Sequence, residues 1–323
     1  MTIVFALFIG LVVAMPLICS KCRSANAEVQ IPYAKLNLCP NCFTDFYKAR
    51  VRKTVEEFKM FREDDAVGVA VSGGKDSAAL LHVLRQAYPR LRLKALHVNL
   101  GIPEYSTHCQ EKVEKLASML DVELHVYNLS EELGISIGDF KKTPFKGKVC
   151  SACGTIKRHI FEELAIKAQV RVLATGHNLE DVAGVLFNNF LYGRWEQFVR
   201  LKPVLPPLAE GMASKVKPLI KCLENENLLY CLYCDVLFRQ IDCPYATGTG
   251  VRKRAKILEL LSRDNPYFRH QLLNRFLEIM PLIESVAEKP TLGRCKVCGF
   301  PSSSEVCAFC RRLAMVKEAV GKV

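Results

Sequence analysis

The chain has 323 residues, with 45 lysines and arginines against 33 aspartates and glutamates, giving a formal net charge of +12 at pH 7. Half of the residues are apolar and 24% are charged, which is typical of a globular protein and excludes a disordered, collagen-like or coiled-coil chain. The length indicates one large domain or two ordinary ones. The basic excess favours an anionic partner, either nucleic acid or an acidic membrane surface.

An uncharged apolar run, residues 1–18, opens the chain. Its length suits a membrane-spanning helix or the apolar part of a signal peptide. No basic segment precedes it, however, and Pro16 interrupts it just before a cysteine motif. We therefore expect translation to start at Met15, with residues 1–14 an extension absent from the native protein and no membrane attachment. A genuine membrane anchor is the alternative.

The 15 cysteines are spaced more like metal ligands than like disulfide partners. Each end of the chain carries two CxxC pairs, formed by Cys19, Cys22, Cys39 and Cys42 and by Cys295, Cys298, Cys307 and Cys310. A CxxC loop places two thiolates on one side of a tight turn, and two such loops complete a tetrahedral zinc site. We expect two Zn²⁺ ions, and because these sites need reduced thiols we expect a cytoplasmic protein.

Between these two zinc knuckles, short apolar runs alternate with amphipathic segments. In chain order we expect a helix at 50–62, a strand at 66–71, a helix at 78–84, a strand at 93–98, a helix at 107–120, a strand at 122–127, a helix at 155–168, a strand at 170–174 and a helix at 178–192. This alternation predicts an α/β fold with a doubly wound, mostly parallel sheet. The expected domains are an N-terminal knuckle at 15–48, the α/β domain at 49–287 and a C-terminal knuckle at 288–323, with 281–294 as the linker.

A glycine-rich segment, SGGKDS at 72–77, joins the first strand to its helix and is termed the phosphate loop below. Glycines let backbone N–H groups approach an anion, and the following helix start adds partial positive charge. The spacing differs from that of a Walker loop. The expected phosphate ligands and supporting residues are Ser72, Gly73, Gly74, Lys75, Asp76 and Ser77. An ordinary strand–helix turn is the alternative.

The remaining cysteines fit no knuckle. Cys150 and Cys153 form a CxxC pair without a second pair at knuckle distance, and five thiols are left: Cys109, Cys222, Cys231, Cys234 and Cys243. Spacing alone leaves a redox pair, cluster ligands and buried thiols equally open.

Several segments together resemble one known family. SGGKDS is similar to the loop of the PP-loop ATP pyrophosphatase superfamily, whose adenine nucleotide alpha hydrolase-like members cleave ATP to AMP and pyrophosphate. The segments LHVNLGI (96–102), CSACGTIKR (150–158), ATGHNLEDVA (174–183) and IDCPYA (241–246), with a knuckle at each end, resemble the TtuA family of tRNA 2-thiouridine synthetases. The resemblance covers residues 15–323.

The resemblance implies a [4Fe–4S] cluster held by three cysteines, which map to Cys150, Cys153 and Cys243. Three thiolates hold such a cluster and leave one iron open to bind a hydrosulfide. The other cysteines close upstream, Cys222, Cys231 and Cys234, leave the third ligand less certain than the first two.

The resemblance also implies ATP, Mg²⁺ and two catalytic residues. Lys157 would stabilise charge on the phosphates or the adenylate, and Asp181 would orient Mg²⁺ or the base that manages the uridine N3 proton. Gly176 would leave room for the nucleotide. His97 would line the adenosine pocket, with a satisfied polar residue as the alternative.

The implied activity is that of an ATP-dependent tRNA uridine 2-sulfurtransferase. The uridine C2 oxygen attacks the α-phosphate of ATP, and sulfide then displaces AMP. The resemblance implies a ubiquitin-like protein with a C-terminal thiocarboxylate as sulfur donor, and we expect a homodimer. A T-loop uridine is favoured over the wobble uridine because both ends of the chain carry knuckles.

Basic side chains are expected to follow the tRNA phosphates, namely Lys21, Arg23, Arg252, Lys253, Arg254, Lys256, Arg311 and Arg312. Two other functions stay open. A PP-loop tRNA cytidine 2-thiolase is disfavoured by the two knuckles, and a non-catalytic zinc module that binds tRNA is disfavoured by the phosphate loop.

Overall fold

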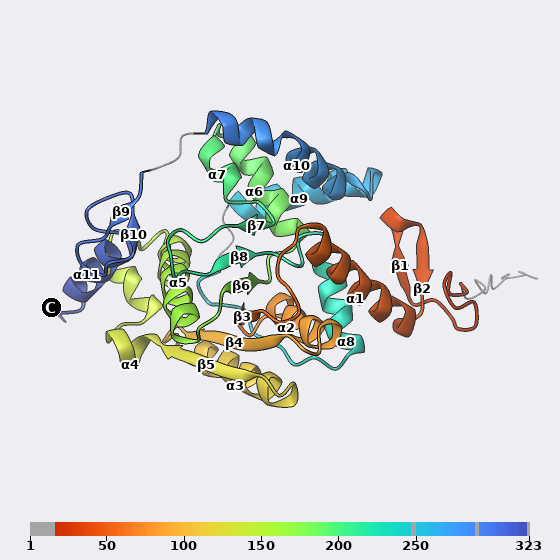
Figure 1. The fold of residues 1–323 in the computed structure, drawn as a ribbon, viewed down its shortest axis with the longest axis horizontal. Helices are drawn as coiled ribbons and strands as arrows, with labels where there is room; N and C mark the ends of the chain where they lie inside the picture. The colour runs from red at the N-terminus through yellow and green to blue at the C-terminus, as the bar shows by residue number, and fades with distance from the viewer. Residues whose placement is uncertain (1–16, 247–249, 288–290, 322–323) are drawn as a thin grey trace, which may run out of the picture.

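A six-stranded sheet forms the centre of the molecule (Figure 1). The computed structural model describes residues 17–246, 250–287 and 291–321, so the extension expected at 1–14 lies outside the described residues. The strand order is β5-β4-β3-β6-β8-β7, and all neighbours run parallel except β7, which pairs antiparallel with β8. The strands are β3 (Ala66–Ala70), β4 (Arg92–Asn99), β5 (Glu123–Asn128), β6 (Val172–Thr175), β7 (Val204–Leu205) and β8 (Ser214–Val216).

Helices cover both faces of this sheet, as the doubly wound fold requires (Figure 1). The helices are α1 (Pro40–Glu57), α2 (Lys75–Ala87), α3 (Tyr105–Met119), α4 (Leu129–Leu133), α5 (Val149–Lys167), α6 (Leu179–Leu191), α7 (Trp195–Val199), α8 (Glu224–Tyr233), α9 (Gly250–Asp264), α10 (Phe268–Val286) and α11 (Ala308–Ala319), with 3-10 turns η1 (Pro32–Ala34) and η2 (Ile137–Lys142). Two small antiparallel pairs belong to the knuckles, β1 (Val29–Ile31) with β2 (Leu36–Leu38) and β9 (Gly293–Arg294) with β10 (Pro301–Ser302). In the described part of the chain, no helix has the length and apolar character needed to span a membrane.

Successive side chains of the central strands enter two different cores. On β6, Val172 and Ala174 pack with α1, α2 and α8, whereas Leu173 packs on the opposite face with α5. Ala95 and Leu96 of β4 divide in the same way. Adjacent residues of a strand point to opposite faces, and both faces here are covered by helices. The strands are therefore apolar along their length, which is why they can be recognised in the sequence as short apolar runs.

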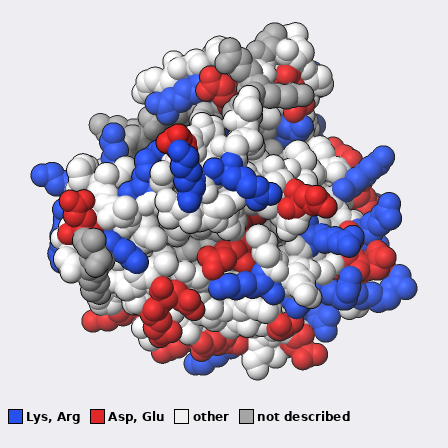
Figure 2. All heavy atoms as spheres, turned by 60° about the vertical axis from the view of Figure 1, so that its left-hand side comes forward, with Lys and Arg blue, Asp and Glu red and all other residues white. Residues whose placement is uncertain are grey.

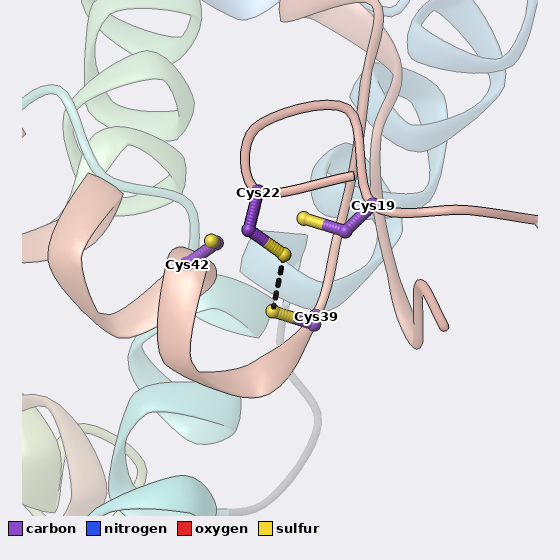
Figure 3. A group of neighbouring side chains, drawn as sticks. All are labelled: Cys19, Cys22, Cys39 and Cys42. Atoms are coloured by element: carbon purple, nitrogen blue, oxygen red, sulfur yellow. Dashed lines mark hydrogen bonds between the residues drawn. The ribbon is translucent and has the colours of Figure 1, made fainter. Parts of the chain in front are cut away.

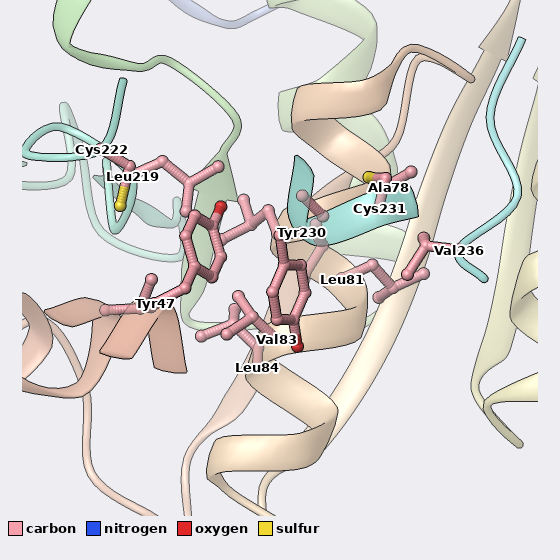
Figure 4. Packing of buried hydrophobic residues seen from close by; sticks show 14 of the residues in the cluster. Tyr47, Ala78, Leu81, Val83, Leu84, Leu219, Cys222, Tyr230, Cys231 and Val236 are labelled. Atoms are coloured by element: carbon pink, nitrogen blue, oxygen red, sulfur yellow. The ribbon is translucent and has the colours of Figure 1, made fainter. Parts of the chain in front are cut away.

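The core formed by α1, α2 and α8 anchors the N-terminal helix behind the phosphate loop (Figure 4). Tyr47 of α1 stacks on Tyr230 of α8, with ring centroids 4.3 Å apart, and Leu81 and Leu84 of α2 belong to the same cluster. The Tyr47 hydroxyl donates to Asn227 Oδ1 at 2.6 Å, so its polar end is satisfied inside the core. Helix α1 thereby holds the helix that follows the phosphate loop.

The structure corrects several expected boundaries, two of them in the helices next to the knuckles. The helix expected at 50–62 is α1, which begins at Pro40 and ends at Glu57, because proline is well suited to the first position of a helix. Residues 281–294 are not simply a linker, since α10 continues through Pro281 to Val286. Met280 and Ile283 pack in a cluster with α6 and α7. This packing on both sides of the proline outweighs the single helical hydrogen bond that it removes.

Candidate active site and metal-binding cysteines

The phosphate loop lies at the carboxyl edge of the sheet, between β3 and α2. The Ser72 N–H donates to Ser77 Oγ at 3.1 Å, and the Ser77 hydroxyl donates to the Gly74 carbonyl at 3.0 Å. Gly73 has a φ of 81°, and a Cβ there would lie 3.1 Å from the backbone of Cys109, so a side chain is excluded. The loop presents backbone N–H groups at a helix start, which is a site for an anion.

Three elements meet at Asp76, in the first turn of α2. Asn178, at the start of α6, and Asn227 of α8 donate to Asp76 Oδ1 at 3.2 and 2.8 Å. Gly176 packs against the same turn, where a Cβ would lie 2.9 Å from the Ser77 backbone nitrogen. The absence of a side chain at Gly176 therefore makes room for the backbone at the start of α2, and not directly for a nucleotide.

Lys75 is held by carboxylates at the mouth of the loop. Its ammonium lies 2.6 Å from Glu224 Oε1 and 3.5 Å from Asp76 Oδ2. Desolvation raises the pKa of Asp181 to about 6; the backbone hydrogen bond from Asn178 opposes this rise, and the charges of Asp76 and Glu224 add to it. Lys75 and the three carboxylates therefore influence one another electrostatically beside the phosphate loop.

His97 and Lys157 line one small cavity beside the loop, together with Ser72 and Cys109. His97 is 2% exposed, and its Nδ1 lies 2.8 Å from the Val71 carbonyl, to which it can only donate. Burial lowers the pKa of His97, so the ring is neutral and Nε2 is an acceptor. Nε2 has no partner among the described residues. The cavity thus offers one buried acceptor and one cation.

The three expected cluster cysteines lie near one another. Helix α5 begins at Val149, earlier than expected, so Cys150 and Cys153 occupy its first turns. The Cys150 thiol donates to the Tyr245 carbonyl at 3.2 Å, which brings the segment around Cys243 alongside. Burial raises the pKa of Cys153, and the nearby Cys243 and Cys150 raise it further.

The other thiols near the third position lie elsewhere. Cys222 and Cys231 are fully buried in the core with α1 and α2 (Figure 4), and Cys234 packs against the same core. Cys153 and Cys243 pack against the core on the other face of the sheet. Cys109, which no spacing rule singles out, lines the cavity beside the loop.

Arg239 is a residue of this site that the sequence analysis misses. Its backbone N–H donates to the Gly73 carbonyl at 2.7 Å, and its Nε and Nη2 lie 3.6 Å from where a Gly74 Cβ would be. The guanidinium carbon lies 5.3 Å from the centre of the Tyr105 ring, and the buried Nε has no partner among the described residues. A cation with a free donor therefore faces the phosphate loop. A lone arginine in a loop carries no spacing signal that would have identified it.

Each terminal cysteine set forms a compact group whose four sulfur atoms lie within 4.8 Å of one another. Cys22 and Cys39 Sγ are 3.9 Å apart (Figure 3), and Cys298 and Cys307 Sγ are 3.7 Å apart. A tetrahedral zinc ion with Zn–S bonds of about 2.3 Å needs sulfur–sulfur distances of about 3.8 Å. Backbone N–H groups of Cys298 and Cys307 lower the pKa of Cys295 to about 6, which favours the thiolate form of a ligand. Both sets fit a tetrahedral metal ion.

The knuckle-borne basic residues do not share one surface, because the two knuckles lie at opposite ends of the molecule (Figure 1). Lys21 and Arg23 belong to the N-terminal knuckle, and Arg311 and Arg312 to α11. The other expected basic residues belong to α9, but the structure does not describe their side chains: Arg252, Lys253, Arg254 and Lys256.

Known proteins resemble this chain over nearly its whole length. The PP-loop domain model matches residues 46–220, and the model of the 2-thiouridine synthetase TtuA N-terminal LIM domain matches residues 18–44. The tRNA-5-methyluridine(54) 2-sulfurtransferase of Pyrococcus horikoshii is 34% identical over 305 residues, covering 94% of this chain and 96% of that protein. The enzyme of the same name from Thermus thermophilus is 37% identical over 298 residues, covering 91% and 90%. The solved U34-tRNA thiolase NcsA from Methanococcus maripaludis, with its [4Fe–4S] cluster, aligns with a TM-score of 0.77 at 27% identity, covering 92% of this chain and 96% of that one.

Proposed function

The chain belongs to the TtuA family of PP-loop tRNA 2-sulfurtransferases, and on that premise we propose that it uses ATP to replace the C2 oxygen of a tRNA uridine by sulfur. One observation carries the proposal: the two segments that hold the three cysteines also reach the phosphate loop or the cavity beside it. Helix α5 contains Cys150 and Cys153 and also Lys157, which lines the cavity beside the loop. The segment that places Arg239 on the loop continues to Cys243.

The first step is adenylation of the uridine. Its C2 oxygen attacks the α-phosphate of ATP, the bond to pyrophosphate breaks, and the oxygen becomes part of the leaving group AMP. Backbone N–H groups of the loop, the Ser72 hydroxyl and Lys157 would stabilise the charge that develops on the phosphates. Arg239, whose free Nε faces Gly74, would hold the departing pyrophosphate.

We propose that Asp181 accepts the uridine N3 proton as the C2 oxygen attacks. A carboxylate with a pKa of about 6 is a stronger base than an ordinary aspartate and is still ionised at pH 7. The single-turnover thiolation rate should therefore rise between pH 5 and pH 7. Asp181→Asn should remove this rise and slow thiolation about 10² to 10⁴-fold. Glu180→Gln is the matched control, because Glu180 also has a raised pKa of about 7; if this variant lost the rise instead, the base would be Glu180.

The cavity next to the loop supports recognition of the adenosine part of ATP. The His97 Nε2 acceptor is buried and unpartnered among the described residues, so a ligand that donates an N–H satisfies it. The amino group of adenine is such a donor. Mg²⁺ would accompany the phosphates, with Asp76 and Glu224, which already flank Lys75, as the nearest carboxylates.

The donor sets of the two kinds of cysteine group favour different metals. Cys150, Cys153 and Cys243 supply three soft thiolates, and in the described chain they do not form a tight four-sulfur group like the knuckles. When bound there, a [4Fe–4S] cluster with three protein ligands supplies an open iron for sulfide. We propose Zn²⁺ for each knuckle, because four cysteines at tetrahedral spacing match its preferred coordination.

Uridine 54 in the T-loop is the proposed target. The relatives above 30% identity are named for position 54, whereas the thiolase named for U34 is 27% identical. We further propose a ubiquitin-like thiocarboxylate protein as sulfur donor and the cytoplasm as compartment, which the free thiols of all 15 cysteines support. A homodimer is supported by exposed apolar side chains on α6, α9 and α10, among them Phe190, Leu260 and Leu282.

Anaerobic purification with iron and sulfide analysis, followed by nucleoside mass spectrometry of tRNA thiolated in vitro, tests this function. We expect bound iron, release of AMP and pyrophosphate, and 2-thiouridine that a transcript with cytidine at position 54 does not acquire. Absence of both iron and 2-thiouridine would contradict the proposal. Appearance of 2-thiocytidine would favour the cytidine thiolase, and tRNA binding without AMP release would favour the non-catalytic module.

A further inference from the structure

The C-terminal knuckle packs directly against α5, the helix that carries the first two cluster cysteines. His159 of α5 stacks on Phe309, with ring centroids 3.7 Å apart, and its ring centroid lies 4.4 Å from that of Phe300. Knuckle cysteines and α5 side chains belong to one buried cluster. The knuckle and the start of α5 therefore form one packed unit.

Two arginines converge on one neutral oxygen at this junction. Arg312 of α11 donates to Thr155 Oγ1 and, at 2.8 Å, to the Ser151 carbonyl. Arg158 of α5 donates to the same Thr155 Oγ1 at 3.3 Å. The Thr155 hydroxyl itself donates to the Ser151 carbonyl at 3.3 Å, so its hydrogen-bonding capacity is used and it brings no negative charge. Each guanidinium has five N–H donors, and most of them stay available for a ligand.

A third arginine, Arg200, follows α7 and lies within electrostatic range of Arg158. Partial desolvation by neighbouring groups lowers the pKa of Arg158, although the residue still reaches solvent, and the positive charges of Arg312 and Arg200 lower it further. Among the described residues, none of the three has a carboxylate partner, whereas Arg50 pairs with Glu226 at 3.1 Å. Arg158 and Arg312 thus meet at one neutral oxygen, with the charge of Arg200 nearby, and an anion would relieve the repulsion between them.

We propose that Arg158 and Arg312, with Arg200 as a neighbouring cation, form a binding site for a phosphodiester group of the tRNA backbone. The proposal rests on the function proposed above, which makes tRNA the substrate. A guanidinium presents paired N–H donors that match phosphate oxygens. Arg158 and Arg200 are exposed, and Figure 2, which turns the side with α5 and α11 toward the viewer, shows lysines and arginines on this face with aspartates and glutamates between them. A surface site of this kind suits a polymer that lies across it.

The phosphates of ATP could also bind to arginine side chains. The structure distinguishes the ATP site from the arginine site. Lys157 lines the cavity with His97 and Ser72, whereas its neighbour Arg158 is not among the lining residues and donates to Thr155 Oγ1, which Arg312 of the knuckle also contacts. Successive residues of a helix point about 100° apart, so α5 presents one cation to the nucleotide and the next to the knuckle side.

The location gives this contact a positioning role. Arg312 bonds to the carbonyl of Ser151, which lies between Cys150 and Cys153. A phosphate bound at the three arginines would lie close to the start of α5 and to the cluster cysteines. Contacts to phosphate carry no sequence information but fix the register of the RNA. They would set the distance between the target uridine and the sulfur.

The test is tRNA binding by the full chain, purified anaerobically, over a series of salt concentrations. Arg158→Gln and Arg200→Gln should each weaken binding about tenfold and reduce the slope of log K against log salt by about 1. Arg158→Lys should keep most of the slope. Arg275→Gln, an exposed arginine on α10, is the charge-matched control and should leave binding unchanged. Zinc and iron contents equal to wild type exclude a folding effect.

The outcomes separate this inference from the proposed function. If wild type thiolates tRNA but both glutamine variants keep its affinity and salt slope, the phosphodiester site is wrong and the function stands. If the variants lose affinity for a non-hydrolysable ATP analogue instead, the arginines bind nucleotide phosphates and the proposal is overturned. If wild type neither binds nor thiolates tRNA, the proposed function fails, and the inference with it.

Discussion

The two cysteine knuckles have the same local structure but pack against different helices of the candidate active site. In each, the second CxxC pair starts a helix, with Cys39 as the N-cap of α1 and Cys307 as the N-cap of α11. Helix α1 packs with α2 and α8, behind the phosphate loop, whereas α11 packs with α5, the helix of the cluster cysteines. The same metal-binding module can therefore stabilise the nucleotide side at one end of the chain and the sulfur side at the other.

The two docking surfaces also differ in chemistry. The N-terminal contact contains a buried polar chain, in which Tyr47 donates to Asn227 and Asn227 donates to Asp76 beside the phosphate loop. The C-terminal contact combines the stacking of His159 on Phe309 with hydrogen bonds from Arg312 at the molecular surface. Buried hydrogen bonds demand one geometry, whereas stacked rings tolerate small displacements. The N-terminal contact therefore contains a fully buried hydrogen bond, whereas the bond from Arg312 to the Ser151 carbonyl at the C-terminal contact is exposed.

The largest expected effect comes from Cys150→Ala, which separates the cluster cysteines from both knuckles. Two remaining thiolates hold an iron–sulfur cluster poorly, so iron content and 2-thiouridine should fall to background while zinc content stays at the wild-type level. Metal analysis and nucleoside mass spectrometry measure both. Cys222→Ala, in the core on the other face of the sheet, is the control and should keep its iron. Loss of zinc from Cys150→Ala would show that the thiols are divided wrongly.

The next effect compares one ligand from each knuckle. Cys39→Ala and Cys307→Ala should each lose one metal ion and part of the folding free energy that it contributes. Because α1 supports the phosphate loop, Cys39→Ala should weaken binding of an ATP analogue more than it lowers iron content. Cys307→Ala should lower iron content more than it weakens binding of the ATP analogue. Calorimetric titration and iron analysis on both variants decide, and the same defect in both would end the proposed division between the knuckles.

A smaller effect is expected from Tyr47→Phe. The change leaves Asn227 Oδ1 without its buried donor, which costs about 1–3 kcal/mol of unfolding free energy. It should also raise KM for ATP, because Asn227 holds Asp76 next to the loop. Denaturant unfolding and steady-state kinetics measure the two effects. Tyr192→Phe, on a ring that is 61% exposed, is the control. Equal stability of the two variants would contradict the polar chain.

The smallest effect is expected from His159→Ala, which removes the stack on Phe309. Its loss should reduce the unfolding free energy by about 0.5–1.5 kcal/mol, beyond the lost burial, and should leave KM for ATP unchanged. His159→Phe keeps an aromatic ring and should restore most of the stability. If the alanine variant instead raised KM for ATP, the C-terminal knuckle would also act on the nucleotide side.

Much of the site follows from local sequence. The four-cysteine groups and the phosphate loop depend on residues close together in the chain, and the structure assembles both knuckle groups as the spacing predicts. Arg239 and Glu224 were not predicted. Each reaches the phosphate loop from a distant segment, and a single charged residue has no local pattern that marks such a contact. The linker predicted to begin at Pro281 is wrong for the opposite reason. Proline locally disfavours a helix, but packing against α6 and α7 keeps α10 helical through this residue.

The sequence by itself determined the kinds of site this protein has: two four-cysteine groups, a phosphate loop on a parallel sheet, and a lone CxxC pair just before a later helix. These depend on spacing, backbone freedom and the apolar alternation of strands, all of which act over short stretches of chain. Only the tertiary structure decided how the sites are combined. In the tertiary structure Cys150 and Cys153 lie beside the segment around Cys243, whereas Cys222 and Cys231 are buried in the core on the other face of the sheet. Each knuckle packs against a different set of helices. Those choices depend on which buried surfaces and polar groups meet across the fold, and such contacts join residues too far apart in the chain for any local pattern to specify.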